Sequence, residues 1–104
     1  SFGLFSELVC YPNPFDISHD TTTTCSYYLN QSSYVSYVIV SRRGQVVKRS
    51  SNSLTSPGKQ LFQWNGQDSS SRDVPKGVYQ LILTASSESW VWDKWTSKHL
   101  ITVL

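Results

Sequence analysis

The stretch "WNGQDSSSRDVPKGVY", residues 64–79, places a large aromatic residue at each end of a serine-rich loop. Asn-Gly readily adopts positive φ, so Asn65-Gly66 predicts a sharp turn at the end of a strand. Pro75 suits position i+1 of a second turn with Gly77 at i+3, which directs the chain into a following strand. The stretch therefore predicts a connection between two strands, with a turn at each end.

The two aromatic residues have a structural role in this interpretation. Tyr79 lies near the start of a long strand that follows a crossing between sheets. In immunoglobulin-like sandwiches a tyrosine there can donate its hydroxyl to upstream backbone and hold the corner. We expect Trp64 and Tyr79 to close the core at the two feet of the loop. The residues between them that are expected to form an adjustable, solvated tip are Ser69, Ser70, Ser71 and Arg72.

Short segments that alternate apolar and polar residues occur along the whole chain, separated by turn residues. They predict strands at residues 4–10, 21–29, 34–40, 46–49, 59–64, 77–85 and 97–104. The polar stretch 50–56 is interpreted as a connection. In the absence of a helical period, this pattern predicts an all-β fold, an immunoglobulin-like β-sandwich of about seven antiparallel strands. The length of 104 residues indicates a single domain, residues 1–104.

Two prolines interrupt the chain after the first predicted strand. Pro12 and Pro14 remove two backbone donors and bias Tyr11 and Asn13 toward extended geometry. No strand ladder continues through such a segment, so we expect the chain to leave the sheet there. Phe15 follows immediately and is expected to anchor this segment in the core.

The composition indicates what kind of protein contains this domain. Charged residues make up only 15% of the chain and Ser and Thr dominate the polar set, which favours an exported β-rich domain. The net charge of +2 is too small to indicate nucleic acid or acidic lipid as a partner. No apolar run approaches the roughly 20 residues that a membrane helix needs. Because the chain starts at Ser1 and contains no methionine, we expect either a piece of a larger exported protein, excised from it or its C-terminal module, or a mature chain whose leader has been removed.

Cys10 and Cys25 are the two cysteines of the chain. In an exported domain an even number of cysteines is compatible with a disulfide, and two buried thiols are the alternative. Neither residue has a second cysteine or a histidine at a ligand-like spacing, which argues against a metal site. The state of the pair stays open at this point.

Groups that could support catalysis or bind a metal are sparse. Asp16, His19 and Asp20 share one loop, but it lacks the glycine-spaced pattern of calcium loops, and zinc would need a fourth ligand from elsewhere. The sequence contains no Gly-x-Ser-x-Gly motif, and its second histidine, His99, lies in the last predicted strand. We therefore predict no metal, no cofactor and no enzymatic activity.

Three tryptophans form the most prominent candidate binding surface. Trp90 and Trp92 fall on the same face of any strand that contains both, and Trp95 follows a turn at Asp93-Lys94. Rigid, amphipathic aromatic side chains stack on sugar rings or bury in a partner protein. They also cover the open end of a sandwich or stack across strands. Packing, a protein interface and carbohydrate binding remain alternatives.

Basic residues cluster around one predicted hairpin, namely Arg42, Arg43, Lys48 and Arg49. The aromatic residues that would stack on bases are missing there, so a solvated hairpin explains the charge better than nucleic-acid binding. Charges in this place also discourage edge-to-edge pairing of strands.

The order of several short motifs resembles the FlgD-like immunoglobulin domain over about residues 8–104. The most specific parts are Pro12-Asn13-Pro14-Phe15 and Trp64-Asn65-Gly66 followed by Gly77-Val78-Tyr79. The resemblance implies a structural role for these residues. The family usually has Asp where this chain has Asn65, and often Gly where it has Ser71.

The resemblance implies a non-catalytic accessory module of a secreted or cell-surface bacterial protein, with a structural, assembly or protein-interaction role. The implied partners are other domains of the parent protein or a neighbouring protein, with carbohydrate as an alternative, no nucleic acid and no membrane insertion. Binding is expected to use the three tryptophans or the tip at 69–72. A related alternative is the type IX secretion sorting domain of Bacteroidetes, which shares the Pro-Asn-Pro start, the Gly-x-Tyr strand and a basic residue in the final strand, here Lys98.

Overall fold

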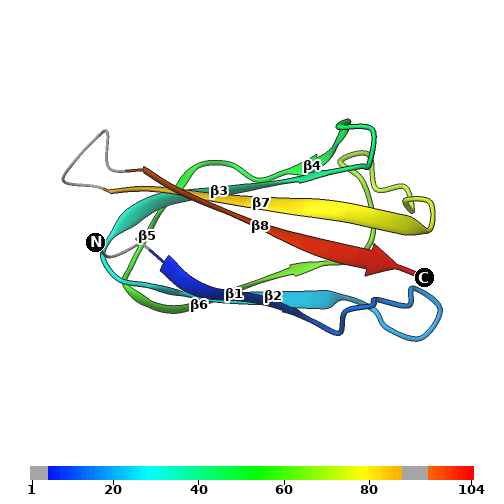
Figure 1. Ribbon diagram of the computed structural model, residues 1–104, viewed down its shortest axis with the longest axis horizontal. Helices are drawn as coiled ribbons and strands as arrows, with labels where there is room; N and C mark the ends of the chain where they lie inside the picture. Colours follow the sequence, from blue (N-terminus) through cyan, green and yellow to red (C-terminus); the bar gives the residue numbers. More distant parts are fainter. Residues whose placement is uncertain (1–4, 88–93) are drawn as a thin grey trace.

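A computed structural model describes residues 5–87 and 94–104 of the chain. These residues form two antiparallel sheets packed face to face (Figure 1). The eight strands are β1 (Phe5–Tyr11), β2 (Thr23–Leu29), β3 (Ser33–Val40), β4 (Val46–Arg49), β5 (Ser53–Thr55), β6 (Gly58–Trp64), β7 (Gly77–Ser87) and β8 (Lys94–Val103). The described residues contain no helix that could span a bilayer.

The two sheets differ in size. The first has three strands in the order β1-β2-β6, and the second has the order β4-β3-β7-β8 with β5 also paired to β3. The long pair formed by β7 and β8 runs in register from Gly77 opposite Val103 to Ser86 opposite Lys94. The fold class expected from the sequence, an immunoglobulin-like β-sandwich, is therefore confirmed.

Strand β5 is the element that the sequence pattern did not predict. It lies in the polar stretch interpreted as a connection and pairs with the beginning of β3. Its central residue, Leu54, is 52% exposed, so the strand has no buried side that would leave an alternating signal. Strand β8 also begins at Lys94, three residues before the predicted start.

The core lies between the sheets and follows the period of two along each strand. In β7 every second residue is buried, and the same alternation buries Cys25, Tyr27 and Leu29 of β2, as the sequence predicted. The Tyr37 ring of the second sheet stacks on the Phe62 ring of the first, with centroids 4.2 Å apart. Full burial of an apolar side chain such as Leu29 stabilises the fold by about 1.5–3 kcal/mol.

Cys10 and Cys25 are joined by a disulfide in this structure. They lie directly opposite each other in the register of β1 and β2, and both are buried. A cross-link that closes a loop of this length restricts the unfolded chain and contributes about 3 kcal/mol in the chain-entropy model. The described residues include no free cysteine.

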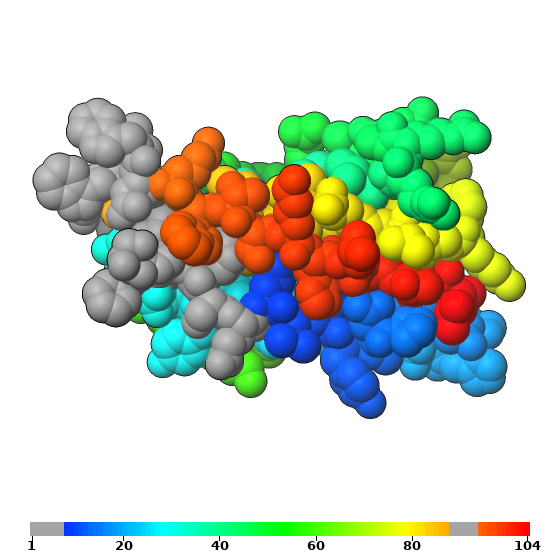
Figure 2. All heavy atoms as spheres, in the orientation of Figure 1, coloured from blue at the N-terminus to red at the C-terminus, as the bar shows by residue number. Residues whose placement is uncertain are grey.

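The segment after β1 crosses from the first sheet to the free edge of β8, and we call residues 12–15 the strap. Its Asn13 side chain bonds to β8 twice: Nδ2 donates to the Leu100 carbonyl at 2.8 Å, and Oδ1 accepts from the Thr102 amide at 3.0 Å. The Phe15 amide then donates to the Thr102 carbonyl, and the Leu104 amide donates to the Phe15 carbonyl. Figure 2 shows these early and late segments, blue and red, packed side by side. The strap therefore joins the two sheets along one edge.

Candidate functional site

The loop between β6 and β7 begins at a buried aromatic anchor. Trp64 is fully buried, and its indole Nε1 donates to the Gln67 carbonyl at 2.9 Å. The Asn65 side chain accepts from the Gln67 amide at 3.1 Å, which forms a turn around an Asn side chain. Farther along, the Val74 amide donates to the Gly66 carbonyl at 2.9 Å. The base of the loop is therefore closed by hydrogen bonds on both sides.

Gly66 is fixed at this position by two independent constraints. Its φ of +75° lies in the left-handed region, which residues with a side chain rarely adopt. A Cβ atom added there would also lie 3.1 Å from Phe15 and 3.2 Å from Ile17. The turn after Trp64 and the strap therefore pack against each other through this glycine.

The tip of the loop, residues 69–72, is exposed, as a solvated tip requires, and forms a hydrogen-bonded turn. Asp68 Oδ1 accepts hydrogen bonds from the amides of Ser70, at 2.9 Å, and Arg72, at 3.0 Å. The Arg72 amide bond is the main cause that holds the pKa of the Asp68 carboxyl below its usual value of 3.8, so this interaction is lost only as the pH falls through that lower pKa. Ser71 has a φ of 63°, the one positive φ of a non-glycine residue in the described ranges. The exposed serines thus sit on a defined turn.

The loop also attaches to the neighbouring strand β4. The Ser69 amide donates to the Val47 carbonyl at 3.0 Å. This bond occupies a backbone acceptor on the outer edge of β4. The loop and the β3–β4 hairpin are therefore held at a fixed separation on one side.

Tyr79 forms the corner that its position in the sequence predicted. The side chain is 6% exposed, and its hydroxyl donates to the Pro75 carbonyl. Its ring meets the Trp64 ring edge to face with centroids 5.6 Å apart. Burial raises the pKa of the Tyr79 hydroxyl, so the hydroxyl stays protonated and able to donate.

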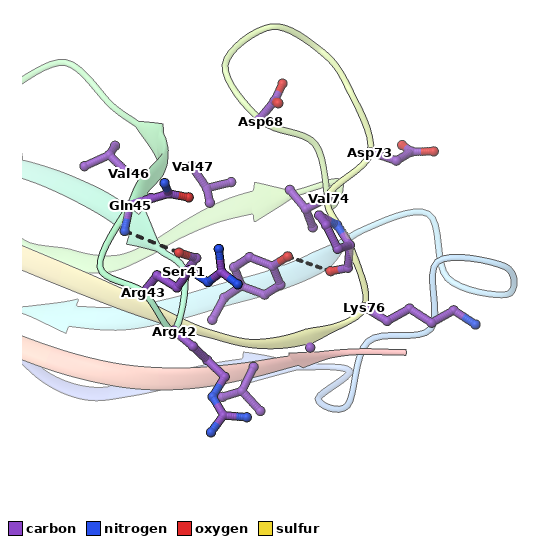
Figure 3. A pocket seen from close by; sticks show the side chains of 14 residues that line it. Ser41, Arg42, Arg43, Gln45, Val46, Val47, Asp68, Asp73, Val74 and Lys76 are labelled. Carbon is purple, nitrogen blue, oxygen red and sulfur yellow. Dashed lines mark hydrogen bonds between the residues drawn. The ribbon is translucent and has the colours of Figure 1, made fainter.

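A groove of about 590 Å³ lies between this loop and the β3–β4 hairpin (Figure 3). One wall is the hairpin turn, residues 41–47, and the other is the loop with the segment 73–79 that leads into β7. Pro75 and Tyr79, which are joined by the bond from the Tyr79 hydroxyl to the Pro75 carbonyl, both line the groove. The volume falls within the range of about 300–1,000 Å³ typical of ligand sites.

Cations dominate the exposed side chains around the groove. Figure 3 shows Arg43 extending from the hairpin turn into it, whereas Arg42 and Lys76 point outward from its rim. In the part of the chain that the structure describes, the ion pairs are His19–Asp16 and Arg72–Asp68, so these three cations have no carboxylate partner there. The two acids of the loop are engaged locally, Asp68 as described and Asp73 by the Gln67 side chain.

Part of the β7 edge is open in this groove. Strand β3 pairs with β7 only as far as Val40 opposite Gln80, and the chain then turns away at Ser41. The Thr102 backbone, opposite Val78 on β8, points outward to the strap, so Val78 is not hydrogen-bonded to β8. The N–H and C=O of Val78 therefore face the groove beyond the end of β3.

Sequence reasoning placed Arg42 and Arg43 on a solvated hairpin and did not connect them with the 64–79 loop. The two walls of the groove are separated by strands β5 and β6 in the chain, and no local pattern brings them together. One signal was available. The predicted strand at 34–40 is shorter than the strand that begins at residue 77, so the longer strand extends beyond its neighbour.

The predicted tryptophan surface falls largely outside the described residues. Trp90 and Trp92 lie in the range 88–93, so their alternatives stay predictions. Trp95 lies in β8 opposite Ala85 and is 41% exposed. Ala85 is fully buried, so this row of side chains faces the inside of the sandwich at its end. The position favours packing for Trp95.

Asp16, Ser18 and His19 form a small hydrogen-bonded cluster after the strap. The Ser18 hydroxyl donates to Asp16 Oδ1 at 2.7 Å, and His19 Nδ1 lies 2.9 Å from Asp16 Oδ2. The bond from Ser18 is the main cause that lowers the pKa of the Asp16 carboxyl. Because the serine proton is held by the carboxylate and one imidazole nitrogen faces both partners, the cluster lacks the relay of a nucleophilic triad. Its bonds close a local turn.

Comparison with solved structures finds flagellar and secretion proteins with this fold. FlgD from P. aeruginosa superimposes with a TM-score of 0.62 and 26% identity, covering 77% of this chain and 60% of that one. FlgD from Xanthomonas campestris, whose structure is described as giving insights into the hook capping essential for flagellar assembly, gives 0.58 and 20%, covering 95% and 65%. PorZ of Porphyromonas gingivalis, a surface component of the type IX secretion system, gives 0.60 and 18%, covering 93% and 11%.

This chain thus spans about two thirds or less of each of these proteins. A search of curated proteins finds no match. The family model of the FlgD Ig-like domain matches residues 15–89, which include the loop between β6 and β7 and both walls of the groove. The chain belongs to the FlgD Ig-like domain family.

Proposed function

We propose that this domain is a non-catalytic structural module of an exported bacterial protein and that its partners are proteins. The family match supports this role, because the structure of the similar FlgD from Xanthomonas campestris is described in connection with hook capping, which is essential for flagellar assembly. The disulfide of β1 and β2 supports an oxidising compartment, since such cross-links persist mainly in exported proteins. A surface position agrees with the description of PorZ, although at 18% identity that likeness concerns the fold alone.

The strap is the observation that carries the proposal. β1 begins at one end of the sandwich and the chain reaches Leu104 at the other, so a pull on both ends acts along the strands (Figure 1). The strap runs parallel to the end of β8, with Phe15 opposite Val103. Its hydrogen bonds lie across the direction of pull and must be stretched together before the sheets separate. Such an arrangement suits a domain that transmits or resists tension between neighbouring parts of an assembly.

Single-molecule force spectroscopy tests this role directly. The domain is placed between two reference domains of known unfolding force and is stretched from its two ends. We expect one unfolding event at high force, and a lower force for Asn13→Ala, which removes both side-chain bonds to β8. Asn52→Ala, at an exposed site outside the strap, serves as the control. Equal unfolding forces for Asn13→Ala and the unchanged domain would contradict the mechanical role.

A type IX secretion sorting domain is a second candidate function. The shared fold of PorZ and the Pro-Asn-Pro segment, the Gly-x-Tyr strand and Lys98 favour it. The test attaches residues 8–104 to a periplasmic reporter in a bacterium with this pathway. Reporter at the cell surface supports sorting, and reporter retained in the periplasm excludes it.

A further inference from the structure

We propose that the groove between residues 41–47 and 73–79 binds an extended, acidic segment of a partner protein. This inference rests on the proposed function in one respect, that the partner is a protein. The segment would add its main chain to the open edge of β7 at Val78 and place a carboxylate against Arg43. Three features of the groove carry the inference: its backbone, its charge and its rigidity.

The backbone of Val78 provides the pairing site. Its N–H and C=O face the groove because β8 is bonded through the neighbouring positions and β3 has already ended at Val40. An unpaired strand edge is a template for an added strand, and many proteins recognise extended peptides in this way. Only a short length of β7 is open here, so the added segment pairs over about one to three residues and needs side-chain contacts as well.

The charge of the groove selects an acidic side chain. Arg43 extends into the groove and forms no ion pair with a described carboxylate. Asp68 and Asp73 also line the groove, but their carboxylates are bonded to other groups of the loop. A planar guanidinium pairs with a carboxylate through two parallel hydrogen bonds, which gives direction as well as attraction. Arg42 and Lys76 at the rim add to the positive potential and accelerate the approach of an acidic segment.

Apolar side chains complete the specificity. Val46, Val47 and Val74 line the groove beside the cations. Successive side chains of an extended segment point to opposite sides, so acidic residues that alternate with small apolar residues match both surfaces. We therefore expect acidic and small apolar residues to alternate along the partner segment.

Hydrogen bonds within the domain hold both walls of the groove. The bond from Ser69 to Val47 fixes the loop on the hairpin, and the bond from Tyr79 to Pro75 fixes the other wall. Binding therefore requires little ordering of the domain, which lowers its entropic cost.

The test is an NMR titration of the isotope-labelled domain with the capped hexapeptide TEVEVT. We expect chemical-shift changes at the amides of residues 41–47 and 74–79, with Val78 among the largest, and weaker binding as salt is added. Two matched peptides separate the contributions. The basic analogue TKVKVT reverses the charge, and a TEVEVT peptide with N-methylated central residues removes the backbone donors. Both are expected to bind at least about tenfold more weakly, a factor that corresponds to losing one or more good contacts.

Variants of the domain locate the site. Arg43→Ala is expected to weaken TEVEVT binding about tenfold or more, and Lys59→Ala, which removes an exposed cation of β6, to leave it unchanged. The proposal is overturned if TEVEVT causes no shifts in the groove at millimolar concentration, if TKVKVT binds equally well, or if Arg43→Ala has no effect. The force measurements stay informative in each case, because Arg43 lies outside the strap. If TEVEVT does not bind in the groove but Asn13→Ala still lowers the unfolding force, the proposed peptide site is rejected and the proposed structural role is retained.

Discussion

The second sheet has two stretches of strand edge at the same end of the molecule, and the chain covers only one of them. The edge of β8 is covered by the strap, where Asn13 and Phe15 occupy the outward-facing backbone of Leu100 and Thr102. The edge of β7 at Val78 is left open because β3 ends early. The strap therefore pairs with the edge of β8, whereas the open edge of β7 is flanked by cations.

The difference shows two solutions to the hazard of an unpaired strand edge. A covered edge gains hydrogen bonds and contributes to stability, but it offers nothing to a partner. An open edge flanked by Arg42, Arg43 and Lys76 repels a second copy of itself while it still accepts an acidic strand. Stability should therefore depend on the covered edge and recognition on the open one.

Among the variants that compare the two edges, Phe15→Ala should cause the largest loss in the free energy of unfolding. Phe15 is fully buried and also carries the backbone bonds of the strap to β8. Its truncation is expected to destabilise the fold by about 3–5 kcal/mol, measured by urea denaturation. Arg42→Ala at the open edge is expected to change stability by less than about 0.5 kcal/mol. Similar losses for the two variants would remove the distinction between the edges.

Asn13→Ala should open the covered edge without touching the core. It removes two hydrogen bonds, from the Thr102 amide and to the Leu100 carbonyl, and both β8 groups become available to another strand. We expect a loss of about 1–2 kcal/mol and increased self-association at high concentration. Sedimentation and denaturation measure the two effects. A variant that stays monomeric and as stable as the parent would show that the side chain of Asn13 is dispensable for covering the edge.

Tyr79→Phe should affect both stability and the open edge. The change removes the bond to the Pro75 carbonyl and keeps the ring that packs on Trp64. We expect a loss of about 1 kcal/mol in unfolding free energy. Because one wall of the groove is released, the binding of TEVEVT should weaken as well. Tyr34→Phe, an exposed tyrosine in β3, is the control and should change neither quantity.

Ser71→Gly is expected to give the smallest effect, and in the opposite direction. Ser71 adopts a φ of 63°, where glycine carries no steric cost. The relief of strain exceeds the added entropy of the unfolded chain, so we expect a gain of about 0.5 kcal/mol. Ser70→Gly lacks this relief and should lower stability. A thermal melt of the two variants distinguishes them, and a loss in both would show that the turn is not strained.

Much of the sandwich could be predicted because its strands carry a local signal. Every second residue of β2 and β7 is buried, and this period is visible in the sequence without any knowledge of partners. Strand β5 was missed because it is held by backbone pairing to β3 while Leu54 remains exposed. A strand that buries no side chain leaves no periodic pattern to detect.

The covered edge and the groove depend on contacts that no local pattern encodes. Phe15 was correctly predicted as an anchor, but the partners of Asn13 lie 87 and 89 residues farther along the chain. The groove similarly needs the end of β3, the hairpin turn and the start of β7 to meet. The hydrogen bonds that the Asp68 carboxylate accepts within the loop tip were also not visible in the sequence.

The strap has a consequence for the order in which the domain can form. The strap bonds to β8, which is the last of the eight strands to be synthesised. This strand also supplies the buried Ile101 and Val103. Contacts between distant parts of a chain form late, because a long loop must close before they contribute. A chain threaded through a translocation pore with its N-terminus leading would therefore stay incompletely folded until β8 emerged. The pairing of the ten residues of β8 would then complete the fold after the chain has crossed the pore.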